Sequence, residues 1–319
     1  MEYKKFSFVI PCYQSENSIE MVLDEIEEVM RQNPELSYEV IAINDNSPDH
    51  VYQVLKKRGK ADNRIKILDL SKNCGKHSAL MAGYHYVDGD IIVNIDDDGQ
   101  CPLDKLWELI EPLKQGYDIS IAKYKKKKQS ALKNFGSFIN AKMAQYLLHK
   151  PPKLQLSNFS AMKRFVCMEI LKYQNPYPYI DGLFLRTTDK IANVSMEERN
   201  RESGVSGYTF FKSLNLWLNG FTAFSVVPLR AATFLGIGFS FVGIIFGVWV
   251  IIRKIFTPNI VAGYSSLMAA LLFISGIIML ILGLMGEYIG RIYISINNSP
   301  QYVIREIINV SNSPSCLDD

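Results

Sequence analysis

The stretch that decides the fold is Ile91-Ile92-Val93-Asn94-Ile95-Asp96-Asp97-Asp98-Gly99-Gln100. An apolar run typical of a buried strand ends there in three acids, a glycine and an amide. Adjacent carboxylates repel one another, and a bound cation offsets that cost. Their oxygens suit a hard divalent ion such as Mg²⁺ or Mn²⁺, which completes its shell with water and substrate phosphates. An acidic surface turn is the alternative interpretation of these residues alone.

The first part of the chain alternates apolar strands with amphipathic helices. Strands are predicted at 6–10, 38–43, 65–70 and 91–93, and helices at 19–30, 51–57 and 77–87. The first strand is expected to stop at Pro11. This alternation predicts an α/β fold with a doubly wound, mostly parallel sheet. Because right-handed crossovers place the carboxyl ends of parallel strands at one edge, Asp45 and the acids at 96–98 are expected to line one crevice.

The hydrophobic residues, 48% of the chain, are unevenly distributed. Residues 231–252 and 260–286 carry no charge, and each run exceeds the roughly 20 residues that cross a bilayer core. Soluble helices need a polar face, so a membrane hairpin is favoured over two buried core helices. The expected organisation is a catalytic domain at 1–209, an interfacial segment at 210–230, a hairpin at 231–286 with spans near 231–253 and 260–286, and a tail at 287–319.

Two crossings return the chain to the side on which it starts. The N-terminal residues run directly into a strand without an apolar signal segment, so the catalytic domain and tail are expected on the cytoplasmic side of the inner (plasma) membrane. Arg253 and Lys254 lie in the far-side loop, against the positive-inside tendency. The five cysteines show no C-x-x-C spacing, which suits reduced thiols. A net charge of +3 does not favour a nucleic-acid partner.

Several short motifs follow one another along the chain, and their order is more specific than any one of them. They are Val9-Ile10-Pro11-Cys12-Tyr13, Asn44-Asp45-Asn46-Ser47-Pro48-Asp49, the segments 73–83, 89–90 and 96–102, Arg201-Glu202-Ser203-Gly204-Val205-Ser206, and the segments 224–230 and 286–291. In this order they resemble glycosyltransferase family 2 enzymes with the GT-A fold. More narrowly they resemble the polyprenyl-phosphate sugar transferases, the group of dolichol-phosphate mannose synthase and bacterial undecaprenyl-phosphate glucosyltransferases. The similarity extends to about residue 305.

The resemblance implies a nucleotide diphosphate-sugar donor. On the matching positions, Pro11 and Tyr13 frame the base and ribose, and Asp45 accepts a hydrogen bond from them. Glu16 stands one place beyond the position where relatives carry an acid. Lys76 is also implied as a donor-binding residue.

The acidic motif carries the implied catalytic and metal roles. Asp96 and the backbone of Asp97 contact the nucleotide sugar, and Asp98 with Gln100 holds Mg²⁺ or Mn²⁺ on the diphosphate, with Asp96 alongside. Asp96 and Asp98 are thereby catalytic residues. A metal in this position acts as a Lewis acid on the departing diphosphate.

The acceptor implied by the resemblance is a polyprenyl (undecaprenyl) phosphate. Arg201, also assigned a catalytic role, binds phosphate with Ser206 close by, and Lys123 and Lys133 stand where relatives carry arginines. Residues 123–128 hold five lysines, which form either a solvated loop or a segment that meets phosphate or anionic lipid.

The expected reaction is an inverting transfer of a hexose-type sugar that feeds cell-surface glycan assembly. A lipid phosphate, with its second pKa near about 6, is largely dianionic and needs little deprotonation. Asp181 is the candidate if a general base exists, and otherwise a cap or turn residue. Two other functions stay open: a membrane polysaccharide synthase, although its Q-x-x-R-W motif is absent, and a non-catalytic scaffold or flippase partner. Small residues in the spans also permit a homo-oligomer.

Overall fold

The computed structural model describes residues 3–124, 151–197 apart from 153, 199, 263–296 and 300–310, with single helical positions between 234 and 256. The chain forms two compact units. The first comprises Met1–Tyr208 together with Asn298–Asp319, and the second comprises Thr209–Asn297. The first unit is an α/β domain, and the second contains the long helix α10 (Tyr264–Ile296).

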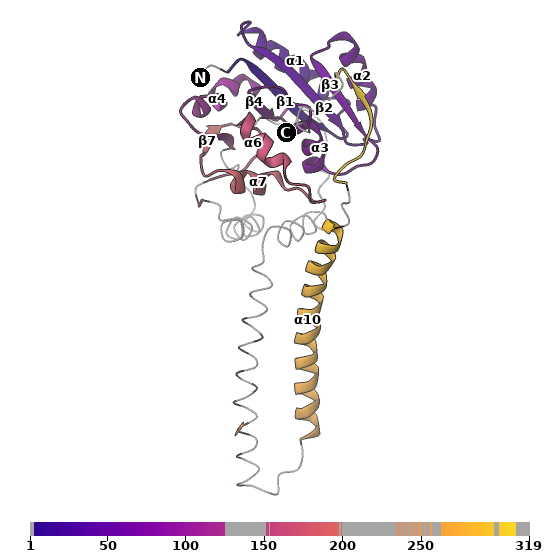
Figure 1. Ribbon diagram of the computed structural model, residues 1–319, viewed down its shortest axis with the longest axis vertical. Helices are drawn as coiled ribbons and strands as arrows, with labels where there is room; N and C mark the ends of the chain where they lie inside the picture. The colour runs from indigo at the N-terminus through magenta and orange to yellow at the C-terminus, as the bar shows by residue number, and fades with distance from the viewer. Residues whose placement is uncertain are drawn as a thin grey trace. The chain divides into compact units, whose positions relative to one another are not determined.

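A sheet with the strand order β7-β5-β6-β4-β1-β2-β3-β8 forms the centre of the α/β unit (Figure 1). The strands are β1 (Lys5–Cys12), β2 (Ser37–Asn44), β3 (Ile65–Leu70), β4 (Ile91–Asn94), β5 (Ile119–Tyr124), β6 (Ser160–Lys163), β7 (Ile191–Met196) and β8 (Ile304–Ile308). The pairs β1–β2, β1–β4, β2–β3 and β5–β7 are parallel. The strands β6 and β8 run antiparallel to their neighbours. The predicted α/β class with a mostly parallel sheet is therefore confirmed.

The first strand continues past Pro11, contrary to the prediction from sequence. The carbonyl of Val9 accepts from Ile95 toward β4, and that of Cys12 accepts from Asp45 toward β2. Because backbone groups alternate in direction along a strand, Pro11 faces the β4 side, beyond the last residue of β4. Its missing N–H therefore breaks no ladder hydrogen bond, and proline is tolerated there.

Helices cover both faces of the sheet. They are α1 (Ile19–Arg31), α2 (Val51–Ala61), α3 (Lys76–Tyr84), α4 (Leu106–Lys114), α6 (Arg164–Leu171) and α7 (Ile180–Thr187), with a 3-10 turn, η1, at Leu103–Lys105. The apolar residues of α1, α2 and α4 form one core with Phe6, Phe8 and Ile10 of β1. On the other face α3 lies so close that a Cβ at Gly83 would meet Val9 and Ile43. In α1 the apolar residues of the predicted amphipathic helix at 19–30 are the buried ones, namely Ile19, Val22, Leu23, Ile26, Val29 and Met30.

The C-terminal segment returns to the sheet after the long helix. The sequence predicts only a tail beyond residue 286, but α10 runs to Ile296 and β8 then pairs with β3. Gln301 secures the connection by donating to the carbonyls of Tyr173 and Asn175, both at 2.8 Å. Because β8 pairs with β3, β3 becomes an internal strand, and β8 itself forms this edge of the sheet.

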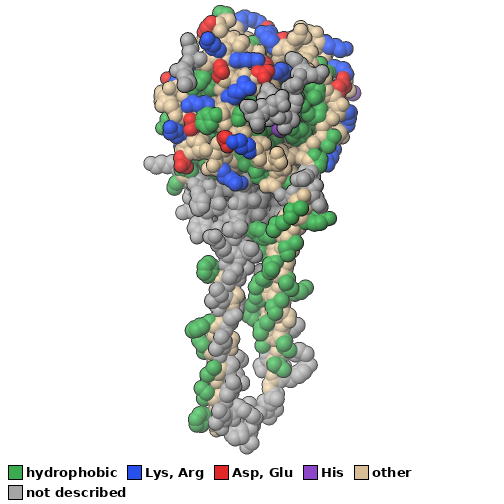
Figure 2. All heavy atoms as spheres, in the orientation of Figure 1, with side chains coloured by type: hydrophobic (Ala, Val, Ile, Leu, Met, Phe, Trp, Pro, Cys, Tyr) green, Lys and Arg blue, Asp and Glu red, His purple; other side chains and the backbone are tan. Residues whose placement is uncertain are grey.

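Helix α10 is 33 residues long, or about 50 Å at 1.5 Å per residue. Within the described part of the chain, one segment, Phe273–Gly290, is long and apolar enough to cross a membrane. Large apolar side chains are exposed on more than one side of the helix, including Phe273 and Met279, 58% and 70% exposed. Figure 2 shows hydrophobic atoms along α10, whereas Lys, Arg, Asp and Glu gather over the α/β unit.

Candidate active site

The three acids after β4 point to different partners. Asp96 forms an ion pair with Lys76 and accepts a hydrogen bond from Asn158 Nδ2 at 2.7 Å. Asp97 instead turns toward the β1–α1 loop, where its Oδ2 accepts from the backbone N–H of Tyr13 at 2.9 Å. Burial raises the pKa of Asp97 to about 6, and the charges of its two acidic neighbours add to the rise. Asp97 therefore holds the loop, while Asp96 and Lys76 form a charged pair at the sheet edge.

Asp45 organises the loop that leads into α3. Its side chain is 3% exposed, and its two carboxylate oxygens accept the backbone N–H groups of Cys74 at 2.7 Å and Gly75 at 2.9 Å. Burial raises the pKa of Asp45, and the two N–H donors oppose the rise. Gly75 adopts a positive φ of 83°, which glycine permits without strain. Asp45 thus holds the backbone of the two residues immediately before Lys76. In this way it also helps to position Lys76 for its ion pair with Asp96.

The β1–α1 and β2–α2 loops are joined by hydrogen bonds at the same edge. The backbone N–H of Gln14 donates to Ser47 Oγ at 2.8 Å, and that of Glu16 donates to Asp49 Oδ2 at 3.0 Å. Glu16 in turn accepts the backbone N–H of His50 at 2.8 Å. The Tyr13 side chain is 46% exposed beside these contacts. An exposed ring above a loop held in this way offers a stacking surface for a planar base.

Asp98 and Gln100 lie in the turn that follows. Asp98 Oδ1 accepts the backbone N–H of Gln100 at 3.1 Å, and Gln100 Nε2 donates to the carbonyl of Arg199 at 3.3 Å. Arg199 is held by Glu25, at 2.9 Å from both carboxylate oxygens, and by Asp104. The turn at residues 98–100 is thus hydrogen-bonded to Arg199, two residues before Arg201 in the sequence.

The donor set at this turn fits a partly protein-ligated cation. In the part of the chain that the structure describes, no three His, Cys, Asp or Glu side chains converge as they would around a fully protein-ligated metal. Mg²⁺ commonly takes only one or two carboxylates, together with waters and substrate phosphates. Asp98 with the adjacent amide of Gln100 suits that smaller set, whereas Asp96 is engaged by Lys76 and Asn158.

Besides Asp96, a buried acid on α7, Asp181, interacts with the charge of Lys76. Asp181 is in the first turn of α7, where burial raises its pKa to about 6 while the charge of Lys76 and a hydrogen bond with Tyr179 oppose the rise. The neighbouring His77 packs edge-on against Tyr179, with ring centroids 5.2 Å apart. Burial, and then the charge of Lys76, lower the pKa of His77 to about 4, so this imidazole is neutral at physiological pH.

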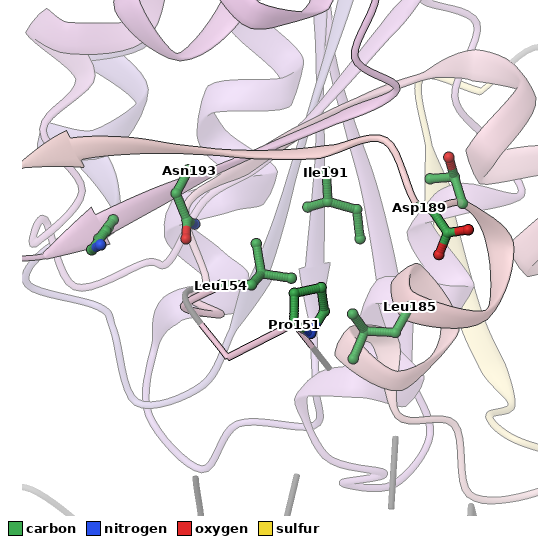
Figure 3. A pocket seen from close by; sticks show the side chains of 8 residues that line it. Pro151, Leu154, Leu185, Asp189, Ile191 and Asn193 are labelled. Carbon is green, nitrogen blue, oxygen red and sulfur yellow. The ribbon is translucent and has the colours of Figure 1, made fainter. Parts of the chain in front are cut away.

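Lys123 is the penultimate residue of β5, whose carboxyl end lies at the same edge of the sheet as that of β4, and it lines a pocket there (Figure 3). The pocket has a volume of about 330 Å³ and does not include the acids after β4. Its lining residues are Lys123, Pro151, Leu154, Leu185, Thr188, Asp189, Ile191 and Asn193. The sequence gives no sign that Lys123 lines a pocket of its own.

Three predicted site residues, Lys133, Arg201 and Ser206, lie outside the described residues. The Gly89-Asp90 motif lies at the opposite end of the strands from the candidate site. Gly89 and Asp90 precede β4 at the opposite edge, where Asp90 Oδ2 accepts the backbone N–H groups of Lys4 and Lys5 at 2.8 and 3.1 Å. These two residues therefore stabilise the fold.

Sequence reasoning missed several residues of the carboxyl edge. Asn158 reaches Asp96 from the turn before the antiparallel strand β6, and no pattern in the sequence marks it. Asp69 had a signal: it interrupts the apolar strand β3, is 2% exposed, and therefore requires partners. Those partners are Asn44 Nδ2 at 2.7 Å and Arg305 Nη1 at 3.1 Å.

The sheet is mostly parallel and carries an acidic turn and charged loops at its carboxyl edge, where open α/β sheets bind their ligands. The chain belongs to glycosyl transferase family 2, whose sequence profile matches residues 7–172, and a second profile, the GtrB C-terminal hairpin, matches residues 227–292.

Relatives match almost the full length. An uncharacterised glycosyltransferase of Bacillus subtilis is 33% identical, covering 97% of this chain and 95% of its own. The SfII prophage-derived bactoprenol glucosyl transferase of Shigella flexneri is 30% identical, covering 95% and 98%. Among solved structures, glucosyl-3-phosphoglycerate synthase from Mycobacterium tuberculosis shares the fold, with a TM-score of 0.50 and 20% identity over 70% of this chain and 79% of its own.

Proposed function

We propose that this protein transfers glucose from a nucleoside diphosphate-glucose to a polyprenyl phosphate at the cytoplasmic face of a membrane. The observation that carries the proposal is the full-length similarity to bactoprenol glucosyl transferases, which includes both the α/β unit and the hairpin. The acidic turn at the carboxyl edge of the sheet supports it, because open α/β sheets bind their ligands at this edge.

The donor is proposed to bind along the carboxyl ends of β1, β2 and β4. The base stacks near Pro11 and Tyr13, above the loop that Asp97 holds. The sugar lies near Asp96, whose pairing with Lys76 balances its charge. Mg²⁺ or Mn²⁺ held by Asp98 and Gln100 supplies the positive charge that the departing diphosphate requires. The remaining donor contacts are assigned to Glu16 and Asp45.

The acceptor phosphate is proposed to meet the cationic residues Lys123, Lys133 and Arg201, with Ser206. Because a dianionic phosphate is already a nucleophile, these cations act mainly by positioning it and neutralising charge. In-line attack on the anomeric carbon inverts its configuration, so an α-linked donor yields a β-linked sugar phosphate lipid. Asp181 stays the candidate if a base assists the attack.

The exposed apolar surface of α10 supports membrane anchoring of the protein. A helix with large apolar side chains on several sides is stable in lipid and costly in water. We place the spans near 231–253 and 260–286, with an interfacial segment at 210–230. Such an arrangement keeps the enzyme where a polyprenyl phosphate presents its head group, and also permits self-association.

The test is transfer of label from nucleotide sugars into lipid by membranes that contain the full chain. UDP-glucose and a UDP-N-acetylhexosamine are compared, with and without Mg²⁺ or Mn²⁺. Label in a small, mild-acid-labile lipid is expected, whereas label in long polymer supports a polysaccharide synthase, and no metal-dependent transfer supports a scaffold. Asp98→Ala should abolish transfer without changing membrane insertion, while Asp24→Asn, an exposed carboxylate on α1, should retain it. Activity in Asp98→Ala would refute the metal role.

A further inference from the structure

Strand β8, the most C-terminal strand among the described residues, carries a β-bulge beside the proposed donor-binding edge. In the pairing of β8 with β3, Glu306 lies opposite Asp69 and Ile304 opposite Leu70, so Arg305 is the extra residue between them. Bulges redirect a side chain and are frequent next to functional sites. Here the bulge directs Arg305 toward the carboxyl end of β3.

Arg305 connects three elements at that edge. Its Nη1 donates to the buried Asp69 Oδ2 at 3.1 Å, and its Nη2 donates to the carbonyl of Ser71 at 3.0 Å and to Asn46 Oδ1 at 3.3 Å. Asp69 also accepts from Asn44 at the end of β2. The guanidinium therefore neutralises a buried carboxylate and joins the end of β3 to the turn after β2.

That turn requires support. Asn46 has a φ of 48°, in the left-handed region that side chains other than glycine adopt at a cost, and the surrounding structure must hold it there. The turn contains Asp45, which fixes Cys74 and Gly75 and so the approach to Lys76. A contact at Asn46 therefore bears on the geometry of the donor site.

We infer that Arg305 is a positioning residue for the nucleoside end of the donor site. This residue joins the site from β8, the strand that follows α10 and pairs with β3. The inference rests on the proposed function for the identity of the ligand. Arg305 acts through Asp69, Asn46 and the carbonyl of Ser71, and contacts none of the reacting atoms.

The experiment compares Arg305→Ala with Glu306→Gln in the full chain. Glu306 is the matched control, because it belongs to the same strand but accepts from Tyr52 at 2.5 Å and Lys56 at 2.8 Å on α2. Hydrogen exchange in peptides covering 42–49 and 69–76 should be about tenfold faster in Arg305→Ala, the factor expected from one lost charge-assisted hydrogen bond. Glu306→Gln should leave these peptides unchanged.

Kinetics provide the second measurement. The KM for UDP-glucose should rise about tenfold in Arg305→Ala while kcat stays within about twofold, since uniform binding is lost and transition-state contacts are kept. Arg305→Lys keeps the charge but not the planar guanidinium, so its KM for UDP-glucose should lie between those of the wild type and Arg305→Ala. This variant also keeps the inference testable if Arg305→Ala does not fold.

Two results overturn the inference. One is equal exchange in Arg305→Ala and Glu306→Gln, and the other is a fall in kcat with KM unchanged. Failure of the proposed function is distinguishable: a wild-type chain that transfers sugar from no nucleotide sugar refutes that function. The exchange data would then decide alone whether Arg305 positions the turn.

Discussion

Replacing Asp45 by Asn tests whether the buried carboxylate holds the loop before α3. The two oxygens of Asp45 accept from Cys74 and Gly75, and an amide can accept only one of these N–H groups. A lost hydrogen bond to a charged group costs about 1.5–3 kcal/mol. Burial raises the pKa of Asp45, which means that the buried charge itself carries a desolvation penalty. Replacing the carboxylate by a neutral amide removes this penalty and offsets part of the lost hydrogen-bond energy, so the net loss of stability is about 2 kcal/mol.

The expected consequence is local. A loss of about 2 kcal/mol corresponds to about a 30-fold increase in the opening equilibrium of the loop. Hydrogen exchange of the full-length protein in detergent should show this acceleration in peptides containing Cys74 and Gly75. The KM for the nucleotide sugar should rise as well, because the loop places Lys76 on Asp96.

Asp24→Asn serves as the control for charge removal. The Asp24 side chain is 63% exposed and pairs with Arg58 on the surface, so its loss should cost no more than about 1 kcal/mol. Equal exchange at residues 74 and 75 in the Asp45→Asn variant and the wild type would refute the anchoring role. So would an equal acceleration in both variants.

Two further predictions concern stability. The folded pKa of His77, about 4, lies below its ordinary value of 6.5, so wild-type stability should fall as pH drops through this window, because the unfolded state then binds more protons. His77→Asn, which keeps an acceptor for the Ile180 N–H, should lose this component in thermal unfolding measured from pH 4 to 7, and an unchanged pH dependence would contradict the reasoning. Gly89→Ala would place a Cβ 2.7 Å from the backbone nitrogen of Ser7, so we expect a loss of about 1–3 kcal/mol in denaturant unfolding with the donor KM unchanged. Gly83→Ala, which meets only the side chains of Val9 and Ile43, should cost less, and the reverse order would show that the clash is not decisive.

Local patterns in the sequence were sufficient for much of the fold. The spacing of apolar residues in α1 matches the side chains that are buried, and the bounds predicted for β3 are those of the strand. The acids at 96–98 follow β4 as expected. These features depend on neighbours within a few positions, so periodicity and breaker residues are enough to reveal them.

The partners of the site residues could not be read in the same way. Asn158 reaches Asp96 across 62 positions, and Arg305 reaches Asp69 across 236. Such contacts depend on the strand order, on the antiparallel strands β6 inside the sheet and β8 at its edge, and on the bulge in β8.

The sequence by itself determined the strand–helix alternation, the acidic turn and the apolar hairpin segments, because each is a local property of the chain. Only the tertiary structure decided that Asp97 accepts from the β1–α1 loop, that Asp45 accepts from the residues before Lys76, and that Arg305 of β8 contacts the carboxyl edge of the sheet. The physical reason is that hydrogen-bond partners are chosen by register and packing, which bring together residues that no short pattern connects.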